Sequence, residues 1–520
     1  MSEPEASRTA GAAATTTGGA HGAPRPVFRI VPALERHPGV VRFAQTQTGR
    51  LVVIVAFAAL AWLADKPAAI GGAALAAFFP AWRRVWVGLA TLGMVLVTRR
   101  MEDVLAVVGS QERAGWLASQ PGFKAAVLVT ALAMVVGYVQ LAKTWGAGWL
   151  RRRPVATFVA LYVALLSLVS GLPLAGAPRL VAWALVAGLG GYLWYGAYSL
   201  RDRVDRRGLA LVVDASAYRP FWGGSNTPIP KAASHLAKIE VRTPEEAAIW
   251  QLKAVKLLAW ALSLGILRAV VVTLATGSPS YPSEWTGPGI PVANAVARGL
   301  GSAGLHVATL RDALASSVAG APYPAHASWA AIALHLVVDL LDISIFGHVA
   351  VAGARMAGFK ALRNTHRPLE SRSIADFWNR YYYYFKELLV DLFFFPTYVR
   401  TLKRHPRLRL FVATLAAAGF GNYLYHYLAS LGDVAAFGVV GTIRARQAYA
   451  AYALLLAVGI GLSQLRRPGA PPAKGSPLRR VATLSSVLLF YGLLAIPAAA
   501  PTGTTVGECW EFLLTLIPRP

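Results

Sequence analysis

The sequence predicts an all-α protein that crosses a membrane many times, and three observations carry this prediction. Hydrophobic residues make up 56% of the 520-residue chain and charged residues only 14%, whereas a soluble domain has roughly 25% charged residues. The mean hydropathy is +0.48. The apolar residues gather in blocks of about 15 to 25, the length of helix that spans a hydrocarbon layer of ~30 Å. So few charges cannot cover a water-exposed surface, and a soluble enzyme is therefore excluded.

The apolar blocks predict about eleven membrane spans within one polytopic membrane domain, residues 29–520. The expected spans are residues 51–64, 68–82, 85–98, 125–141, 155–174, 180–200, 254–276, 329–351, 408–431, 447–465 and 481–499. The first two are short and joined by Asp65-Lys66-Pro67, which is also compatible with a hairpin that does not fully cross. Residues 506–517 are expected to add a partial span.

The formal net charge of +27 indicates the orientation of the protein in the membrane and not binding to nucleic acid. The Lys and Arg residues stand mainly at the ends of apolar blocks, as in Arg83-Arg84 and Arg466-Arg467. Long loops that are rich in these residues remain in the cytosol and are attracted to anionic headgroups. We therefore expect a cytosolic N-terminus, cytosolic loops at residues 201–253 and 355–407, and membrane lipids rather than nucleic acid as partners.

Residues 1–28 are expected to be a disordered cytosolic tail. The first 25 residues are rich in Ala, Gly, Thr and Ser, and they lack the basic and apolar regions of a signal peptide. The heavy use of Ala and Arg is typical of a GC-rich bacterial genome, which would place the protein in an inner membrane. The lone cysteine, Cys509, excludes an intramolecular disulfide and a multi-cysteine zinc site.

The segment near residues 373–399 differs from a plain span. It begins with Ser373, followed three residues later by Asp376, which resembles the capping box at the start of a helix. It ends in an aromatic run closed by Pro396 and contains Lys386 and Asp391, among other charges. So many charges exclude a helix that faces lipid. We predict a re-entrant or interfacial element that other parts of the protein cover.

In this segment the sequence resembles the membrane-bound O-acyltransferase family. The signature of that family is a Pro, a Ser, Phe-Trp-x-Arg, an aromatic or His pair, an Asp and a Pro. The matching residues are Pro368, Ser373, Phe377, Trp378, Arg380, Asp391 and Pro396. The family also has a catalytic histidine in the next span, where this chain has His426. The resemblance covers residues 362–428 and marks residues 329–431 as the core of the domain.

Two departures from the family pattern leave room for a catalytically inactive scaffold. Bacterial members commonly have a His shortly after Trp-x-Arg, where this chain has four tyrosines, Tyr381 to Tyr384. They also have a Gly after the catalytic His, where this chain has Tyr427. The tyrosine run is itself typical of an aromatic belt at the membrane interface.

His426 is the candidate catalytic residue on chemical grounds as well. An imidazole inside a span costs free energy unless it has a partner or a task, and burial keeps it neutral and able to accept a proton. It could be the general base for a hydroxyl that attacks a thioester, with Asn379, or alternatively Asn422 one turn earlier, orienting the base or the oxyanion. The alternatives are a structural His426 that bonds between helices, and a Trp378 and Arg380 that only anchor the segment. Ser373 has a sufficient role as a cap.

A second polar constellation lies in the span before the motif. His335, Asp339 and Asp342 follow each other at i, i+4 and i+7 and therefore share one face of a helix. Arg268 in the preceding span is the candidate counter-ion of the aspartates. Three interpretations stay open: a salt-bridge network, a polar lining of the acyl-transfer chamber, or coupling to a metal or a proton.

The sequence therefore predicts a membrane-embedded O-acyltransferase. The resemblance implies a cytosolic acyl-CoA or other acyl thioester as donor substrate, with no bound cofactor or metal, and a hydroxyl acceptor on an envelope glycan or lipid. A partner protein that delivers the acceptor is left open. The alternative is a transporter that uses His335, Asp339, Asp342 and Arg268 as an ion or proton relay; paired broken helices in two halves of the chain would favour it.

Overall fold

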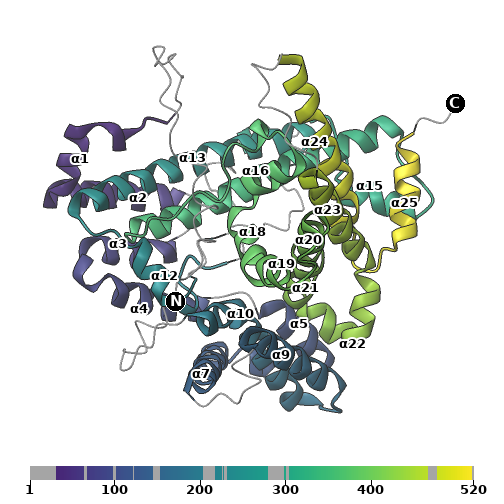
Figure 1. Cartoon of the computed structure of the whole chain (residues 1–520), viewed down its shortest axis with the longest axis horizontal. Coiled ribbons are helices and arrows are strands. Elements are labelled where there is room, and N and C mark those ends of the chain that lie inside the picture. Colours follow the sequence, from purple (N-terminus) through teal and green to yellow (C-terminus); the bar gives the residue numbers. More distant parts are fainter. Residues whose placement is uncertain are drawn as a thin grey trace. The chain divides into compact units, whose positions relative to one another are not determined.

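The computed structural model describes residues 31–63, 67–97, 101–120, 122–144, 153–202, 217–224, 231–278, 304–465 and 477–517, together with four single positions between them. Within these ranges the regular structure is helical, and an isolated antiparallel bridge joins Glu240 and Phe359. The described residues from Ala33 onward belong to one compact unit (Figure 1). The prediction for residues 1–28 lies outside the described residues.

The helices follow one another with short connections in most places. The first group is η2 (Leu34–Arg36), α1 (Pro38–Gln45), α2 (Gln47–Leu63), α3 (Pro67–Phe78), η3 (Pro80–Trp82), α4 (Arg83–Val97), α5 (Glu102–Gln111), α6 (Gly115–Ala118) and α7 (Phe123–Thr144). The second is α9 (Pro154–Gly171), α10 (Gly176–Arg201), α12 (Ala232–Ile239), α13 (Pro244–Thr276), α15 (Leu310–Val318) and α16 (Ala325–Met356). The third is η4 (Pro368–Glu370), α17 (Ile374–Tyr381), α18 (Tyr383–Leu389), η5 (Val390–Phe394), α19 (Phe395–Arg400), α20 (Pro406–Thr414), η6 (Leu415–Gly421), α21 (Asn422–Ala429), α22 (Leu431–Ala445), α23 (Gln447–Leu465), α24 (Pro477–Ala499) and α25 (Val506–Thr515).

In the described part of the chain, seven helices are long and apolar enough to cross a membrane: α7, α9, α10, α13, α16, α23 and α24. Two bent pairs, α1 with α2 and α20–α21 with α22, raise the number to nine if each pair is one span. The predicted count of about eleven is not confirmed. The predicted spans fall mainly on helical residues, but residues 68–82 cover both α3 and η3, and residues 408–431 run past the bend between α21 and α22. α3 has 12 residues and α4 has 15. At 1.5 Å per residue a 12-residue helix covers only ~18 Å of a ~30 Å layer.

The two longest helices, α13 and α16, run side by side (Figure 1). α13 begins at Thr243, whose hydroxyl accepts a hydrogen bond from the Glu246 N–H at 3.1 Å, and it ends at Gly277. Gly277 has φ +76°, the left-handed conformation that glycine adopts without strain. Signals at both ends therefore fix the length of this helix at 33 residues.

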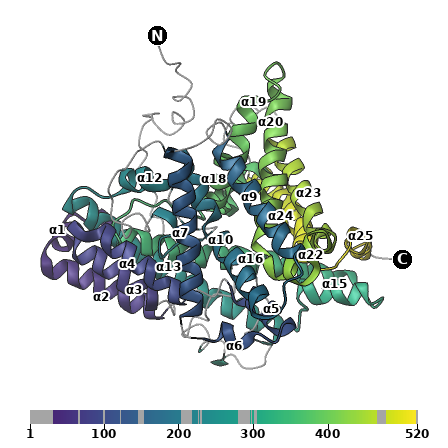
Figure 2. The same cartoon turned by 90° about the horizontal axis from the view of Figure 1, so that it is seen from below.

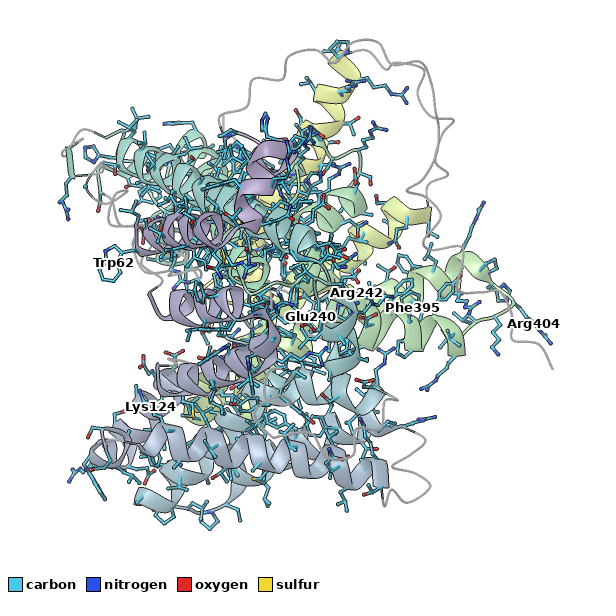
Figure 3. The ribbon with its side chains drawn as sticks, turned by 90° about the vertical axis from the view of Figure 1, so that its left-hand side faces the viewer. Trp62, Lys124, Glu240, Arg242, Phe395 and Arg404 are labelled. Carbon is cyan, nitrogen blue, oxygen red and sulfur yellow. The ribbon has the colours of Figure 1, made fainter. Side chains whose placement is uncertain are left out.

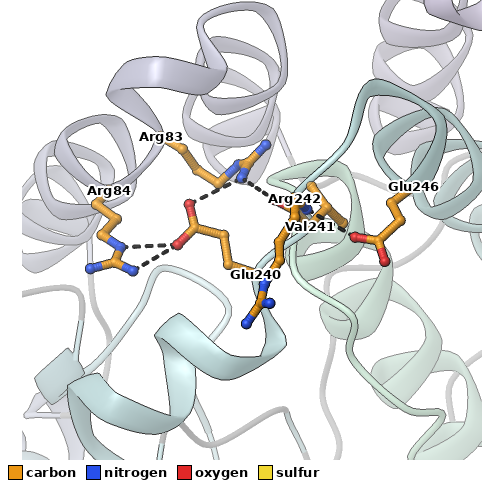
Figure 4. A network of polar contacts seen from close by, with 6 residues as sticks. All are labelled: Arg83, Arg84, Glu240, Val241, Arg242 and Glu246. Atoms are coloured by element: carbon orange, nitrogen blue, oxygen red, sulfur yellow. Dashed lines mark hydrogen bonds and ion pairs between the residues drawn. The ribbon is translucent and has the colours of Figure 1, made fainter.

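The backbone beside α13 and α16 joins two loops that the sequence places on one side of the membrane. The Val241 N–H donates to the Gly358 carbonyl at 3.0 Å, and the Lys360 N–H donates to the Ile239 carbonyl at 2.7 Å. Next to this bridge the carboxylate of Glu240 accepts hydrogen bonds from both Arg83 and Arg84, as Figure 4 shows. Residues 239–241 and 358–360 therefore lie at the same end of the helices.

The signature segment is a broken helix and not a straight span. α17 ends at Tyr382, whose φ of −118° and ψ of 56° interrupt the helix, and α18 then passes into the π-helix η5. α19 and α20 continue as a hairpin, which Figure 2 shows at the edge of the domain. In Figure 3 this hairpin extends past the neighbouring helices, with Phe395 nearer its base and Arg404 at its tip.

Candidate functional site

The start of α17 confirms the predicted cap. The Ser373 hydroxyl accepts a hydrogen bond from the Asp376 N–H at 3.0 Å, and the Asp376 carboxylate accepts one from the Arg372 N–H at 3.0 Å. The other oxygen of Asp376 accepts a hydrogen bond from Arg380 Nε at 2.8 Å. Arg380 therefore has a local partner one turn away, which suits a residue that fixes the position of the segment.

The break between α17 and α18 exposes backbone groups, and residues 364–366 satisfy them. The Thr365 hydroxyl donates to the Tyr381 carbonyl at 3.1 Å, and the His366 N–H donates to the Arg380 carbonyl at 2.8 Å. Asn364 accepts two hydrogen bonds, from the Tyr383 N–H at 3.1 Å through its carbonyl and from the Tyr384 N–H at 3.2 Å through its side chain. These bonds hold the tyrosine run in one conformation.

A chain of ring contacts leads from the signature to His426. Trp378 and Phe385 are buried, with ring centroids 6.4 Å apart, and Phe385 lies 5.5 Å from the His426 ring. Beyond His426 follow Tyr449 at 5.0 Å and then Tyr452 at 4.9 Å from Tyr449. His426 is itself half-buried. The histidine that the sequence selects therefore lies between the signature helix α18 and helix α23.

Asp339 acts on the same group of tyrosines. Its carboxylate interacts electrostatically with Tyr381 and Tyr382, and both of these interact with Tyr452. The Asp339 side chain is 35% exposed and lies 3.9 Å from Nε2 of His335. The tyrosine run therefore links two groups of residues that the sequence presents separately. One is the signature segment with His426, and the other is His335, Asp339 and Asp342. Electrostatics thus couple Asp339 to Tyr381 and Tyr382, and ring contacts link Tyr452 through Tyr449 to His426.

Arg268 pairs with Asp342, which confirms one of the two pairings that the sequence predicts. Arg268 Nε bonds to one carboxylate oxygen of Asp342, and Nη2 bonds to the other at 3.2 Å. The Asp342 side chain is 6% exposed. The ion pair joins α13 to α16 and neutralises the charge of Asp342 where the two helices pack. Arg268 does not pair with Asp339, which interacts electrostatically with Tyr381 and Tyr382.

Asn422 is a buried amide without a hydrogen bond. It is 0% exposed, and neither its nitrogen nor its oxygen has a partner among the described residues. Asn422 directly follows the π-helix η6, which packs against the π-helix η5. Gly421 permits this packing, because a Cβ at that position would lie 2.7 Å from the Phe393 ring. π-helical turns are frequent at functional sites, and Asn422 lies one turn before His426 on the same face.

Asp391 in η5 belongs to an ionic network that sequence reasoning missed. Its carboxylate accepts hydrogen bonds from the Tyr198 hydroxyl at 3.0 Å and pairs with Lys231 at 2.6 Å. Lys231 also pairs with Glu387 at 2.9 Å. Burial opposes the charge on Glu387, but the ammonium groups of Lys386 and Lys231 lower the pKa of this carboxyl overall. No sequence signal links residue 231 to residue 391, because only the fold brings α12 to the signature.

The other asparagine proposed from the sequence, Asn379, has a different environment. It is exposed on α17, whereas its neighbours Phe377 and Trp378 are buried.

Among the described residues, no group of three or more His, Cys, Asp or Glu side chains is arranged to hold a metal ion. The stripe of His335, Asp339 and Asp342 includes the ion pair with Arg268 and a contact between His335 and Asp339.

Comparison with known proteins adds no relative: no known family matches the chain, and no curated protein is similar to it in sequence. The class of protein follows from the fold. The chain is a helical integral membrane protein in which His426 of α21 lies against Phe385 of α18 and Tyr449 of α23.

Proposed function

We propose that the protein transfers an acyl group from a thioester to a hydroxyl at His426. One observation carries the proposal: the His426 ring lies 5.5 Å from Phe385 of the signature and 5.0 Å from Tyr449. The histidine is thus beside the segment that resembles the O-acyltransferases, and it is neither fully buried nor exposed.

In the proposed reaction the acceptor hydroxyl gives its proton to a ring nitrogen of His426 while its oxygen attacks the thioester carbonyl carbon. The tetrahedral adduct carries a negative oxygen. When the adduct collapses, the C–S bond breaks and the imidazolium returns the proton to the departing thiolate. The products are an ester and a free thiol, so atoms and charge balance without a metal or a redox partner.

Asn422 is the better of the two asparagines for the supporting role. Its buried carboxamide has an N–H₂ group without a partner, and an isolated donor in a site with little water stabilises a developing oxyanion strongly. Asn379 is exposed and therefore suits contact with the part of a substrate that remains in water. Trp378, Arg380 and Asp391 hold the broken helix through packing and ion pairs.

The donor in this proposal is acyl-CoA or another acyl thioester that arrives from the cytosol, and the acceptor is a hydroxyl of an envelope glycan or lipid. The inner membrane and a cytosolic N-terminus belong to the proposal too. The +27 net charge favours a site of entry for an anionic donor on the basic side.

The experiment measures release of free thiol from a panel of acyl-CoA thioesters of different chain length by the protein in lipid nanodiscs. His426→Ala should lower the rate by about 10²- to 10⁴-fold. His405→Ala is the matched control, because His405 is exposed on the α19–α20 hairpin, and it should leave the rate unchanged. A folded His426→Ala protein with the full rate would exclude this mechanism. A wild-type protein that is inactive with every thioester would favour an inactive scaffold.

A second candidate function is proton-coupled transport. The observation that favours it is the Asp339 carboxylate, which Arg268 leaves unneutralised and which lies 3.9 Å from His335. Asp339→Asn would abolish proton-coupled uptake into proteoliposomes if this carboxylate carried the proton. In the acyl-transfer proposal Asp339 only orders the tyrosines around the site. The same variant should then release thiol at a measurable, reduced rate.

A further inference from the structure

A second group of charged residues lies at the end of α13 and α16 that carries Arg355. We call Lys253, Lys256, Arg355, Arg363 and Glu35 the basic cluster. Lys253 Nζ lies 4.2 Å from the centroid of the Trp250 ring, and the Arg355 guanidinium lies 5.0 Å from the same centroid. Two cations on different helices therefore share one indole ring, although like charges repel each other.

The basic cluster has more positive than negative charge. Glu35 is the acid that interacts with Lys253, Arg355 and Arg363, but its carboxylate already pairs with Lys256. No carboxylate of the described residues lies within ion-pair distance of Lys253, Arg355 or Arg363. Four cations thus have one anion between them.

Burial of these cations raises the free-energy cost of their unbalanced positive charge, because less water is present to solvate it. Arg355 is 5% exposed, and its Nε donates to the Ala361 carbonyl at 2.8 Å. Arg363 is half-buried, and burial and the charge of Arg367 outweigh the effect of Glu35 and lower the pKa of its guanidinium. Beside it, Asn364 is 1% exposed and its side-chain nitrogen has no hydrogen-bond partner among the described residues. A buried charge without a counter-charge destabilises the fold.

We propose that the basic cluster binds the phosphate of an anionic phospholipid headgroup. Two guanidinium groups and an ammonium group are the side chains that proteins use to hold phosphate oxygens. The depth is that of a headgroup: Lys253 stands directly before the apolar residues 254–276 of α13, and Arg355 is the penultimate residue of α16. Trp250, with its amphipathic ring, is typical of this layer of the membrane.

The bound headgroup also acts on the signature segment. Arg363 precedes Asn364, which accepts hydrogen bonds from the backbone of Tyr383 and Tyr384 just after the α17–α18 break. A phosphate that holds Arg363 therefore restrains the residues that order the break. This link is independent of the reaction at His426, because it depends only on hydrogen bonds in the structure.

The test is native mass spectrometry of the full-length protein during titration with phosphatidylglycerol, with phosphatidylcholine as the neutral lipid. The wild type should retain phosphatidylglycerol in preference to phosphatidylcholine. Lys253→Gln combined with Arg363→Gln should weaken the tightest binding about 30-fold, since each basic residue contributes about one kcal/mol near a membrane surface. The matched control is Lys403→Gln with Arg404→Gln, which removes the same charge from exposed positions on the hairpin and should leave the tightest binding intact.

Glu35→Gln provides a test in which the expected result is tighter binding, which poor folding of the variant would not produce. Removal of the acid from the basic cluster should tighten phosphatidylglycerol binding about fivefold. Equal binding by wild type, Glu35→Gln and the Lys253/Arg363 double variant would overturn the proposal. Inorganic phosphate is the second probe. If inorganic phosphate binds the wild type more tightly than the double variant while phosphatidylglycerol binds no better than phosphatidylcholine, the anion site stands and its assignment to a lipid headgroup is overturned.

Discussion

Arg268 and Asp342 bind each other through two hydrogen bonds across the contact between α13 and α16. Both belong to helices that are candidates for membrane spans, so neither charge has an easy alternative partner. Breaking such a pair leaves one buried charge alone, whereas removing both charges costs less.

A double-mutant cycle measures the coupling between these two residues. Arg268→Leu alone should lower the free energy of unfolding by about 3 to 5 kcal/mol, and Asp342→Asn alone should also lower it. The combined variant should recover a large part of the loss, and thermal unfolding in detergent or nanodiscs gives all four values. If the two single effects simply add, Arg268 and Asp342 do not interact energetically.

The topology of the long loops is the second prediction. Arg242 and Arg372 are exposed and belong to the loops that the sequence places in the cytosol. A single cysteine at either position, in a Cys509→Ser background, should react with a membrane-impermeant maleimide only after the cells are opened. Ala321→Cys, exposed in the loop before α16, is the matched position at the other end of the α16 span and should react in intact cells. The reverse pattern would invert the topology and remove the cytosolic donor from the proposed function.

Acid stability is the third prediction, and it concerns Glu387. The pKa of Glu387 is lower in the folded protein than its ordinary value of about 4.5, so its charge stabilises the fold. The stabilisation is complete above the unfolded pKa of about 4.3 to 4.5 and is lost as the pH falls through the lower folded pKa. Glu387→Gln should therefore flatten the decline in stability below pH 4.5. Lys231→Met, which removes one partner ammonium, should shift the decline to higher pH, and thermal unfolding scans across pH 3 to 7 compare the variants. A wild-type acid slope in Glu387→Gln would contradict the assignment.

The sequence was a good guide wherever the determinant is local. Ser373 caps α17 because a hydroxyl three residues before a free N–H needs no tertiary context, and the helical spacing of Asp339 and Asp342 indicated a polar face. The span count was less predictable, because apolar composition does not show that α3 ends after 12 residues. The electrostatic interaction of Asp339 with Tyr381 and Tyr382 was not predictable from spacing, since it depends on how the broken helix packs on α16. The π-helices before and after the hairpin leave no periodicity that distinguishes them from α-helix.

The fourth prediction separates a functional Asn422 from a structural one. The side chain is fully buried, and neither amide atom has a hydrogen bond among the described residues. A buried polar group without a partner costs about 1 to 3 kcal/mol, so a structural role gives no reason for an amide at this position. Asn422→Leu keeps the same branched arrangement of side-chain heavy atoms and removes the unpaired polar groups.

We therefore expect Asn422→Leu to be as stable as the wild type, or more stable by about 1 to 3 kcal/mol. We also expect it to release thiol from acyl-CoA about 10²- to 10³-fold more slowly, because the substitution removes the proposed oxyanion donor. Most substitutions of buried residues lower stability and rate per cell together through loss of folded protein. A variant that is as stable as the wild type but releases thiol more slowly has lost an interaction that forms only when the substrate is present. Rate per folded molecule and melting temperature should be measured on one preparation. If Asn422→Leu unfolds at a lower temperature and each folded molecule keeps its rate, the amide is structural and the oxyanion in the proposed reaction needs a different donor.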